Sequence, residues 1–442
     1  MRQNRPPFLS PARLARRVAL AALWMGAGAA ALAQGAAPKP GDPQPPDIDP
    51  LALQSAPEAP AAAAPGSRFF VEGAVGRSSQ RQGLGDDTVS RLSLDFSRSF
   101  RLGEGWRARL SNRLDVTDPR AVGAESRTLN SLREAYVAWT PGEGPLLIEA
   151  GRINLRHGPA YGDNPSDFFG TGALRSPITV EPLQRRENRQ GTVMLRGQWA
   201  LGAHTLALAA APKLDDRPDR SAFSLDLGST NASSRLLGTW GTRWSERLNT
   251  QLLVLGERGQ SPRLGASATA LLGDAVVAYG EWSRGRGPSL ATRLLGTGAE
   301  VRRDRIAAGV TLALPAKVSL TLEASRNGFG LTESERRTVQ ALGPMAFGNA
   351  LLAAQARQEP FGRDAFTVYL TQNGLVWRSL DLIALVRQNT TDDSRLVWVE
   401  LRHKGAGFDA ALQWQHLSGA AFTEFGYPPV RSQVQGVVTW YF

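Results

Sequence analysis

The last ten residues, Gln433 to Phe442, are the feature that most constrains the fold. A strand that exposed an apolar face and a free edge to water would tend to aggregate, whereas a closed barrel has no free edge. The pattern therefore predicts a terminal β-strand with one face toward lipid and the other toward an aqueous lumen. The first face carries Val434, Gly436, Val438, Trp440 and Phe442, and the second carries Gln433, Gln435, Val437, Thr439 and Tyr441.

The first 33 residues have the layout of a secretory signal peptide. Five arginines precede or enter an apolar run from Val18 to Leu32, and Ala31-Leu32-Ala33 stands before Gln34. We expect cleavage after Ala33. A twin-arginine signal at Arg16-Arg17 is the alternative. No later apolar run approaches the roughly 18 residues that a membrane helix needs.

Residues 34–66 are rich in Pro and Ala and poor in large apolar side chains. Such a segment cannot bury enough apolar surface to fold alone, so we expect a periplasmic linker. It is either a simple tether or a short binding peptide for a periplasmic partner. Residues 67–442 then form one domain, which we predict to be an outer-membrane β-barrel.

About 18 strand-like segments follow, which predicts an all-β fold, a transmembrane antiparallel β-barrel. Short Gly, Pro or acidic turns alternate with longer polar connections, and tryptophans recur beside the short turns, as in the aromatic girdle of a membrane interface. The predicted strands lie near 68–78, 88–100, 105–117, 130–140, 145–155, 188–200, 203–213, 233–245, 247–258, 261–272, 274–285, 302–314, 316–327, 363–373, 377–389, 393–403, 406–417 and 433–442.

The segment from Thr332 to Glu359 is ambiguous. Thr332-Glu333-Ser334-Glu335 has the pattern of a helix capping box, and the stretch after Asn349 is rich in Ala. We expect a long loop that contains a helix. The alternative is a strand near 346–356.

Arginines dominate the inward face that the alternation defines. Without the five signal arginines and the acidic linker, the formal charge of +11 leaves a barrel domain of about +9. These arginines either pair with inward acids as cross-strand struts or make the pore positive. The candidates are Arg91, Arg107, Arg109, Arg113, Arg196, Arg235, Arg243, Arg305, Arg387 and Arg402; the inward acids are Asp95, Asp115, Glu149, Glu257, Glu281, Glu323, Asp381 and Glu400.

The polar connection from Arg156 to Arg189 is the longest one with informative residues. In a barrel whose other connections are mostly short, such a loop either caps the mouth or folds into the lumen as a constriction. Gly158 and Gly162 permit close backbone turns. The constriction candidates are Arg156, His157, Tyr161, Asp163, Asp167, Arg175, Arg185, Arg186 and Arg189.

The sequence offers little for catalysis. It has four His and no Cys, and it lacks a nucleophile elbow and spaced metal ligands. A hydrolase site built from His157, Asp163, Ser166 and Asp167 is the alternative. We predict no catalytic residue, no metal, no cofactor and no nucleic-acid partner.

Two features resemble known bacterial proteins. The terminal Trp440-Tyr441-Phe442 resembles the closing signal of outer-membrane β-barrels, which the barrel assembly machinery recognises. The Gly151-Arg152 step into a polar loop, with the general layout, resembles porin-type barrels and, more loosely, the alginate-export group. The resemblance covers the architecture of residues 67–442. It implies a pore in the outer membrane for polar solutes, and the inward arginines favour anionic solutes or a polyanionic polysaccharide. The alternative is a loop-plugged barrel that serves as a surface receptor, an adhesin or a partner of a secretion assembly.

The mature chain should begin at or near Gln34 and fractionate with the outer membrane, because a signal peptide precedes a chain that offers only strands for crossing. Mass spectrometry of the purified protein and membrane fractionation check this. An intact Met1 terminus, or recovery in the soluble fraction, would contradict it.

Overall fold

A computed structural model describes residues 67–81, 85–120 and 126–442. The predicted signal peptide (1–33) and linker (34–66) lie outside these residues. Eighteen strands form one sheet. Their bounds are β1 Ser67–Gln80, β2 Asp86–Gly103, β3 Trp106–Asp118, β4 Thr128–Trp139, β5 Leu146–Ile153, β6 Thr192–Leu201, β7 His204–Ala211, β8 Arg235–Ser245, β9 Leu248–Glu257, β10 Arg263–Leu271, β11 Val276–Pro288, β12 Glu300–Leu314, β13 Val318–Asn327, β14 Asp364–Gln372, β15 Leu380–Asn389, β16 Ser394–Lys404, β17 Phe408–Ser418 and β18 Val430–Tyr441.

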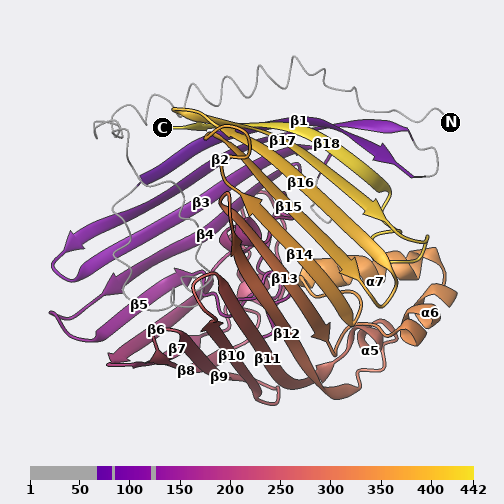
Figure 1. Ribbon diagram of the computed structural model, residues 1–442. Coiled ribbons are helices and arrows are strands. Elements are labelled where there is room, and N and C mark those ends of the chain that lie inside the picture. The colour runs from indigo at the N-terminus through magenta and orange to yellow at the C-terminus, as the bar shows by residue number, and fades with distance from the viewer. Residues whose placement is uncertain (1–66, 82–84, 121–125) are drawn as a thin grey trace. The chain divides into compact units, whose positions relative to one another are not determined.

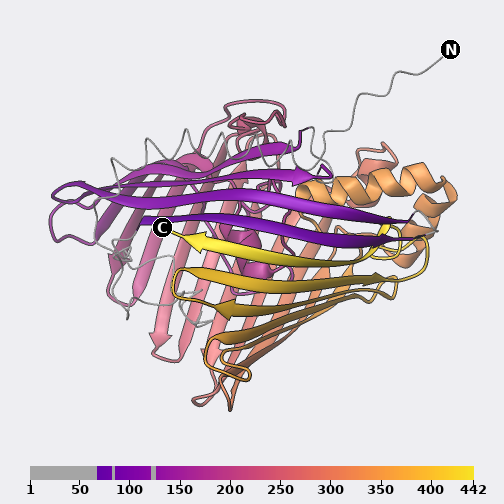
Figure 2. The ribbon, with the colours of Figure 1, turned by 90° about the horizontal axis from the view of Figure 1, so that it is seen from above.

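The sheet closes on itself. Each strand pairs antiparallel with the next in the chain, and β1 pairs antiparallel with β18. At this seam Phe70 lies opposite Tyr441, and the backbone N–H of Phe442 donates to the carbonyl oxygen of Phe69 at 3.0 Å. Figure 1 and Figure 2 show the first strands, in indigo, beside the last, in yellow. The predicted closed barrel is confirmed.

The two faces of β18 are those expected from the sequence. Val434, Val438 and Trp440 are 45%, 40% and 55% exposed on the outer face, whereas Val437 and Thr439 are buried on the inner face. The same period of two holds on most strands. It breaks in β4, where a bulge opposite Ser111 and Asn112 places two consecutive residues, Arg133 and Glu134, on the inner side.

The connections divide the barrel into two ends. The turn end carries the short connections, such as those between β2 and β3, β6 and β7, and β8 and β9. The loop end carries the long ones, including 154–191 and 328–363. Trp106, Trp199 and Trp440 lie at the turn end and are exposed on the outer face, as expected for a girdle.

The loop end also carries helices. They are α3 Pro182–Glu187, α4 Leu227–Thr230, α5 Leu290–Leu294, α6 Glu333–Ala341 and α7 Pro344–Arg357. The predicted capping box is present, because the Thr332 side chain accepts from the N–H of Glu335 and the Glu335 side chain accepts from the N–H of Thr332. The alternative strand near 346–356 is wrong, since this stretch is α7, whose Phe347 and Leu351 pack in an apolar cluster with α5 and α6.

Within the described part of the chain, no helix has the length and apolar character needed to cross a membrane.

Deleting Phe442 should impair assembly more than replacing Gln433 with Ala. The deletion removes the hydrogen bond to Phe69 and a ring contact with Phe69 at 5.4 Å between centroids, whereas Gln433 lies on the inner face. The yield of heat-modifiable folded barrel on a gel measures the difference. Equal yields of the two variants would show that the terminal aromatic residue does not support closure.

Candidate functional site

The connection from 154 to 191, here the inner loop, folds into the barrel. Its residues contact the inner faces of β1, β2 and β4 on one side and of β11 to β14 on the other. Figure 2 shows its magenta helix α3 within the ring of strands. Contacts with opposite walls place the loop inside the ring of strands and not over its mouth.

Two buried carboxylates of the wall hold the backbone of the inner loop. Glu323 on β13 accepts from the N–H groups of Tyr161 at 2.7 Å and Gly162 at 2.9 Å. Glu281 on β11 accepts from the N–H of Ala160 at 2.7 Å and from the hydroxyl of Ser166 at 2.7 Å. A hydrogen bond in a folded protein typically contributes about 0.5–1.5 kcal/mol. The wall thereby satisfies backbone donors that a loop inside a barrel could otherwise leave unpaired.

The glycines of the inner loop permit this approach. A Cβ atom on Gly158 would overlap the carboxylate of Glu281, and one on Gly162 would overlap the side chains of Thr367 and Glu323. Gly158 also has a φ of 77°, a conformation that favours glycine. The two glycines therefore fix where the loop meets the two acids.

Charged groups add further anchors on the same wall. Arg305 on β12 donates to Asp163 at 2.5 Å, and Arg189 pairs with Asp167 inside the loop. Tyr369 on β14 donates to Glu181, which also caps α3 by accepting from the N–H of Leu183. These contacts extend the anchoring from β11 to β14.

Apolar side chains anchor the loop against a third part of the wall. Phe168 and Phe169 are buried against Met194 of β6, Leu237 of β8 and Leu253 of β9. These wall residues face inward, so this part of the inner wall is apolar rather than polar. The sequence pattern did not assign an apolar inner surface to these strands.

The opposite wall holds the end of the loop. Arg68 on β1 pairs with Glu187, Arg133 on β4 donates to the Asn188 side chain at 2.9 Å, and Arg91 on β2 donates to the carbonyl oxygen of Ile178 at 3.2 Å. Arg68 and Arg133 are not among the residues that the sequence indicated. The bulge in β4 explains the omission of Arg133, because it places this residue outside the regular alternation.

Most arginines of the predicted inward set are paired. Arg113 is buried and contacts Glu72 at 2.9 Å, Asp115 at 3.0 Å and Asp95 at 3.3 Å. The other pairs or polar contacts are Arg91 with Glu72, Arg109 with Glu134, Arg196 with Glu149, Arg402 with Glu400 and Asp409, Arg305 with Asp163, and Arg235 with the Thr230 carbonyl and the ring of Phe169.

Two partly exposed arginines differ from this set. Arg185 on α3 and Arg387 on β15 have no side-chain hydrogen bond or ion pair among the described residues, and their charges are close enough to repel each other. Burial, followed by the charges of Arg387 and Arg189, lowers the pKa of Arg185 to about 10, so the group stays charged at neutral pH. One carboxylate, Glu424, lies near both. We call Arg185 and Arg387 the arginine pair.

The remaining candidates are dispersed. Arg107 and Arg243 lie toward the turn end, and their side chains have no polar partner within the described ranges. Arg156 is exposed, Arg175 contacts Asp226 at 3.6 Å, and Arg186 donates to the carbonyl oxygen of His157 at 3.0 Å.

The alternative hydrolase residues do not form a triad. The hydroxyl of Ser166 donates to Glu281, and Asp167 pairs with Arg189. Burial lowers the pKa of His157 to about 4, and its Nδ1 atom has no partner among the described residues. Across those residues no cluster of three or more His, Cys, Asp and Glu could hold a metal ion.

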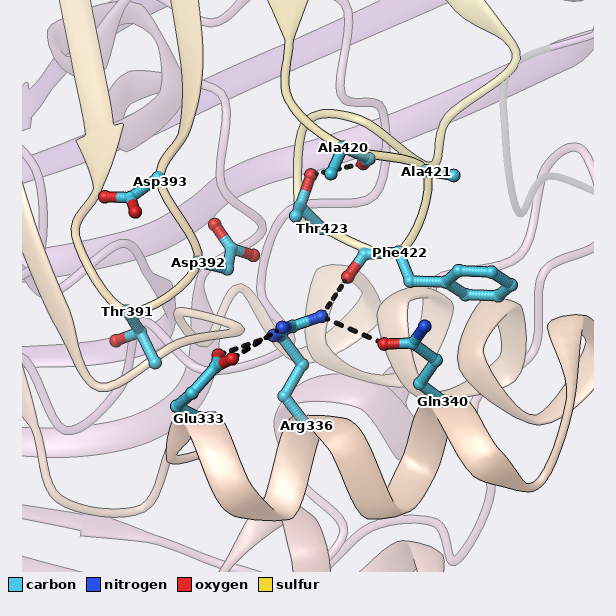
Figure 3. A pocket seen from close by; sticks show the side chains of 10 residues that line it. All are labelled: Glu333, Arg336, Gln340, Thr391, Asp392, Asp393, Ala420, Ala421, Phe422 and Thr423. Carbon is cyan, nitrogen blue, oxygen red and sulfur yellow. Dashed lines mark hydrogen bonds and ion pairs between the residues drawn. The ribbon is translucent and has the colours of Figure 1, made fainter.

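A pocket of about 620 Å³ opens at the loop end, between α6, the β15–β16 turn and the β17–β18 connection. Figure 3 shows Arg336 at its centre, held by Glu333 at 2.8 Å and donating to the carbonyl oxygen of Phe422 at 2.6 Å. Asp392 and Asp393 complete its polar side. This loop-end pocket is separate from the arginine pair in sequence and in lining residues.

Comparison with known proteins supports the fold. No family model matches the chain, and no curated protein does. Among solved structures, OccAB1 of Acinetobacter baumannii is 11% identical, with 85% of this chain and 96% of that chain covered and a TM-score of 0.53. The fold is that of a porin-type barrel. A mutant porin of Rhodopseudomonas blastica is also 11% identical, covering 85% and 99% of the two chains, with a TM-score of 0.42.

Replacing Glu281 and Glu323 together with Ala should release the inner loop from the wall. The change removes the acceptors of its backbone N–H groups, so trypsin should cleave at loop arginines that the wild-type protein protects, while the barrel keeps its heat-modifiable band. Glu149→Ala is the matched control, because Glu149 pairs with Arg196 of the neighbouring strand. Equal protection in the double variant and the wild type would contradict the anchoring role.

Proposed function

We propose that the protein is an outer-membrane channel that passes small anionic solutes past the inner loop. The porin-type fold supports passage across the outer membrane, and the inner loop supplies a constriction. The arginine pair is the observation on which the proposed selectivity rests, because two neighbouring guanidinium groups lie on the inner side without an ion pair among the described residues. A polyanionic polysaccharide is a less suitable solute, since the loop contacts opposite walls of the barrel and so crosses the path of a polymer.

The proposal does not assign selectivity to the column of Arg107, Arg109 and Arg113. Arg113 is already neutralised by three carboxylates, and Arg109 by Glu134. A paired guanidinium attracts a passing anion less than an unpaired one does. We therefore infer that Arg109 and Arg113 mainly brace the wall between β1 and β4.

Replacing Arg185 and Arg387 together with Gln should lower the preference of the pore for anions. A unit charge about 4 Å from a solute contributes about 1 kcal/mol in water. The anion-to-cation permeability ratio should therefore fall about fivefold or more. The reversal potential of a planar bilayer under a potassium chloride gradient measures it.

The control is the replacement of Arg109 and Arg113 with Gln. It should reduce the yield of folded barrel, because it leaves Glu72, Asp95 and Asp115 without a shared partner, and it should leave the reversal potential of the folded fraction nearly unchanged. A larger loss of anion preference in this control than in the variant of Arg185 and Arg387 would overturn the assignment.

The second candidate function is a plugged barrel that acts as a surface receptor. The loop-end pocket favours it, because a cavity of about 620 Å³ with a central Arg and several acids lies where an external ligand would arrive. A barrel that does not conduct, and that still does not conduct when Glu281 and Glu323 are replaced, would support the receptor in place of the channel. Recognition of Trp440-Tyr441-Phe442 by the assembly machinery and a periplasmic partner for residues 34–66 remain proposals under both functions.

A further inference from the structure

Four glutamines form a patch on the inner wall next to the arginine pair. Gln413 and Gln415 lie on β17, and Gln435 and Gln433 lie directly opposite them on β18. All four are on the inner face and partly exposed. We call these residues the glutamine patch.

The amides of the patch form a chain of hydrogen bonds that ends on a carboxylate. Gln433 donates to Gln435 at 2.9 Å, Gln435 donates to Gln413, and Gln413 donates to Glu400. The side chain of Gln415 has no polar partner among the described residues. An amide offers two N–H donors and an acceptor oxygen with two lone pairs, so each member keeps hydrogen-bonding capacity for a solute.

Strand register places the patch close to the arginine pair. Arg387 lies opposite Leu396, which lies opposite Leu417, and Gln415 is the next inward residue of β17 toward the turn end. A glycine borders the patch, because Gly76 lies opposite Gln435 and a Cβ atom on Gly76 would overlap the Cβ of Gln435. Two strand spacings of about 4.8 Å separate β15 from β17, and two residues along a strand advance about 7 Å, so the Cα atoms of Arg387 and Gln415 lie roughly 12 Å apart. The long side chains of both residues project inward, and a six-carbon chain can bridge the distance that remains between their polar ends.

We infer that the glutamine patch is a hydroxyl-binding subsite, and that the solutes are polyhydroxylated carboxylates such as sugar acids. The inference rests on the proposed function: the carboxylate of the solute binds the arginine pair, and its hydroxyl groups exchange hydrogen bonds with the amides. Hydroxyls both donate and accept, as amides do, whereas a fixed charge would favour only one of these roles. A simple anion would use the arginine pair and gain nothing from the patch.

The test compares two six-carbon acids in planar bilayers, gluconate and hexanoate, which share the carboxylate and differ in hydroxyl groups. The main variant replaces Gln413 and Gln415 with Met, which keeps the side-chain length and leaves the closing strand unchanged. The permeability of gluconate relative to hexanoate should fall about three- to tenfold, as expected for the loss of one or two neutral hydrogen bonds. The permeability of hexanoate and chloride should stay within the error of the wild type.

Thr311→Val with Thr321→Val is the matched control, since this pair shares an inward hydrogen bond at 2.8 Å on β12 and β13, away from the patch. Gln415→Met alone is the second variant, because its side chain has no polar contact with the described residues and its loss should not affect folding. This single variant should also lower the permeability of gluconate relative to that of hexanoate.

A gluconate-to-hexanoate ratio that is the same in the wild type and in both patch variants would overturn the subsite, and the patch would then be a cross-strand strut. The proposed function would stand if that wild type still preferred anions to cations. A wild type with no anion preference would overturn both proposals, and an equal loss for the two acids would assign the effect to pore width instead of hydroxyl binding.

Discussion

The whole structure depends on the pairing of β1 with β18. A sheet in an apolar surrounding cannot leave a row of N–H and carbonyl groups unpaired, because each one would cost several kcal/mol. The two strands pair along the full length of the seam, from Phe70 opposite Tyr441 to Gln80 opposite Val430, so no unpaired edge remains there. Closure then separates an outer face, where Val434 and Trp440 are exposed, from an inner face, where charged groups gather.

Inside the closed wall, charge serves two different purposes. On β1 to β4, arginines and acids neutralise one another around Arg113 and Asp95, and this network also holds the end of the inner loop through Arg68 and Arg133. On β11 and β13, Glu281 and Glu323 satisfy the loop backbone instead of pairing with arginines. The arginine pair differs from both groups, because neither of its members has an ion pair among the described residues.

The sequence predicts the wall well and the lumen poorly, for a physical reason. Alternation with a period of two, turn residues and the terminal strand are local signals, so all eighteen strands and the helix start at Thr332 could be placed from the sequence. The inner loop depends on contacts between distant residues, such as Ala160 with Glu281, and on the apolar inner surface of Leu237 and Leu253. Nothing near Gly158 in the sequence indicates which strand it will meet. The bulge at Arg133 shows the same limit, since one extra residue changes the face of every side chain after it.

The position of the loop anchors has a consequence for how the chain folds. The inner loop precedes β6, yet Glu281, Arg305, Glu323 and Tyr369 come from strands that follow it by more than a hundred residues. Arg68, Arg91 and Arg133, by contrast, come from strands that precede the loop. The complete set of loop anchors therefore requires strands from both halves of the chain, and the loop can be fully held only in a barrel whose later strands are in place.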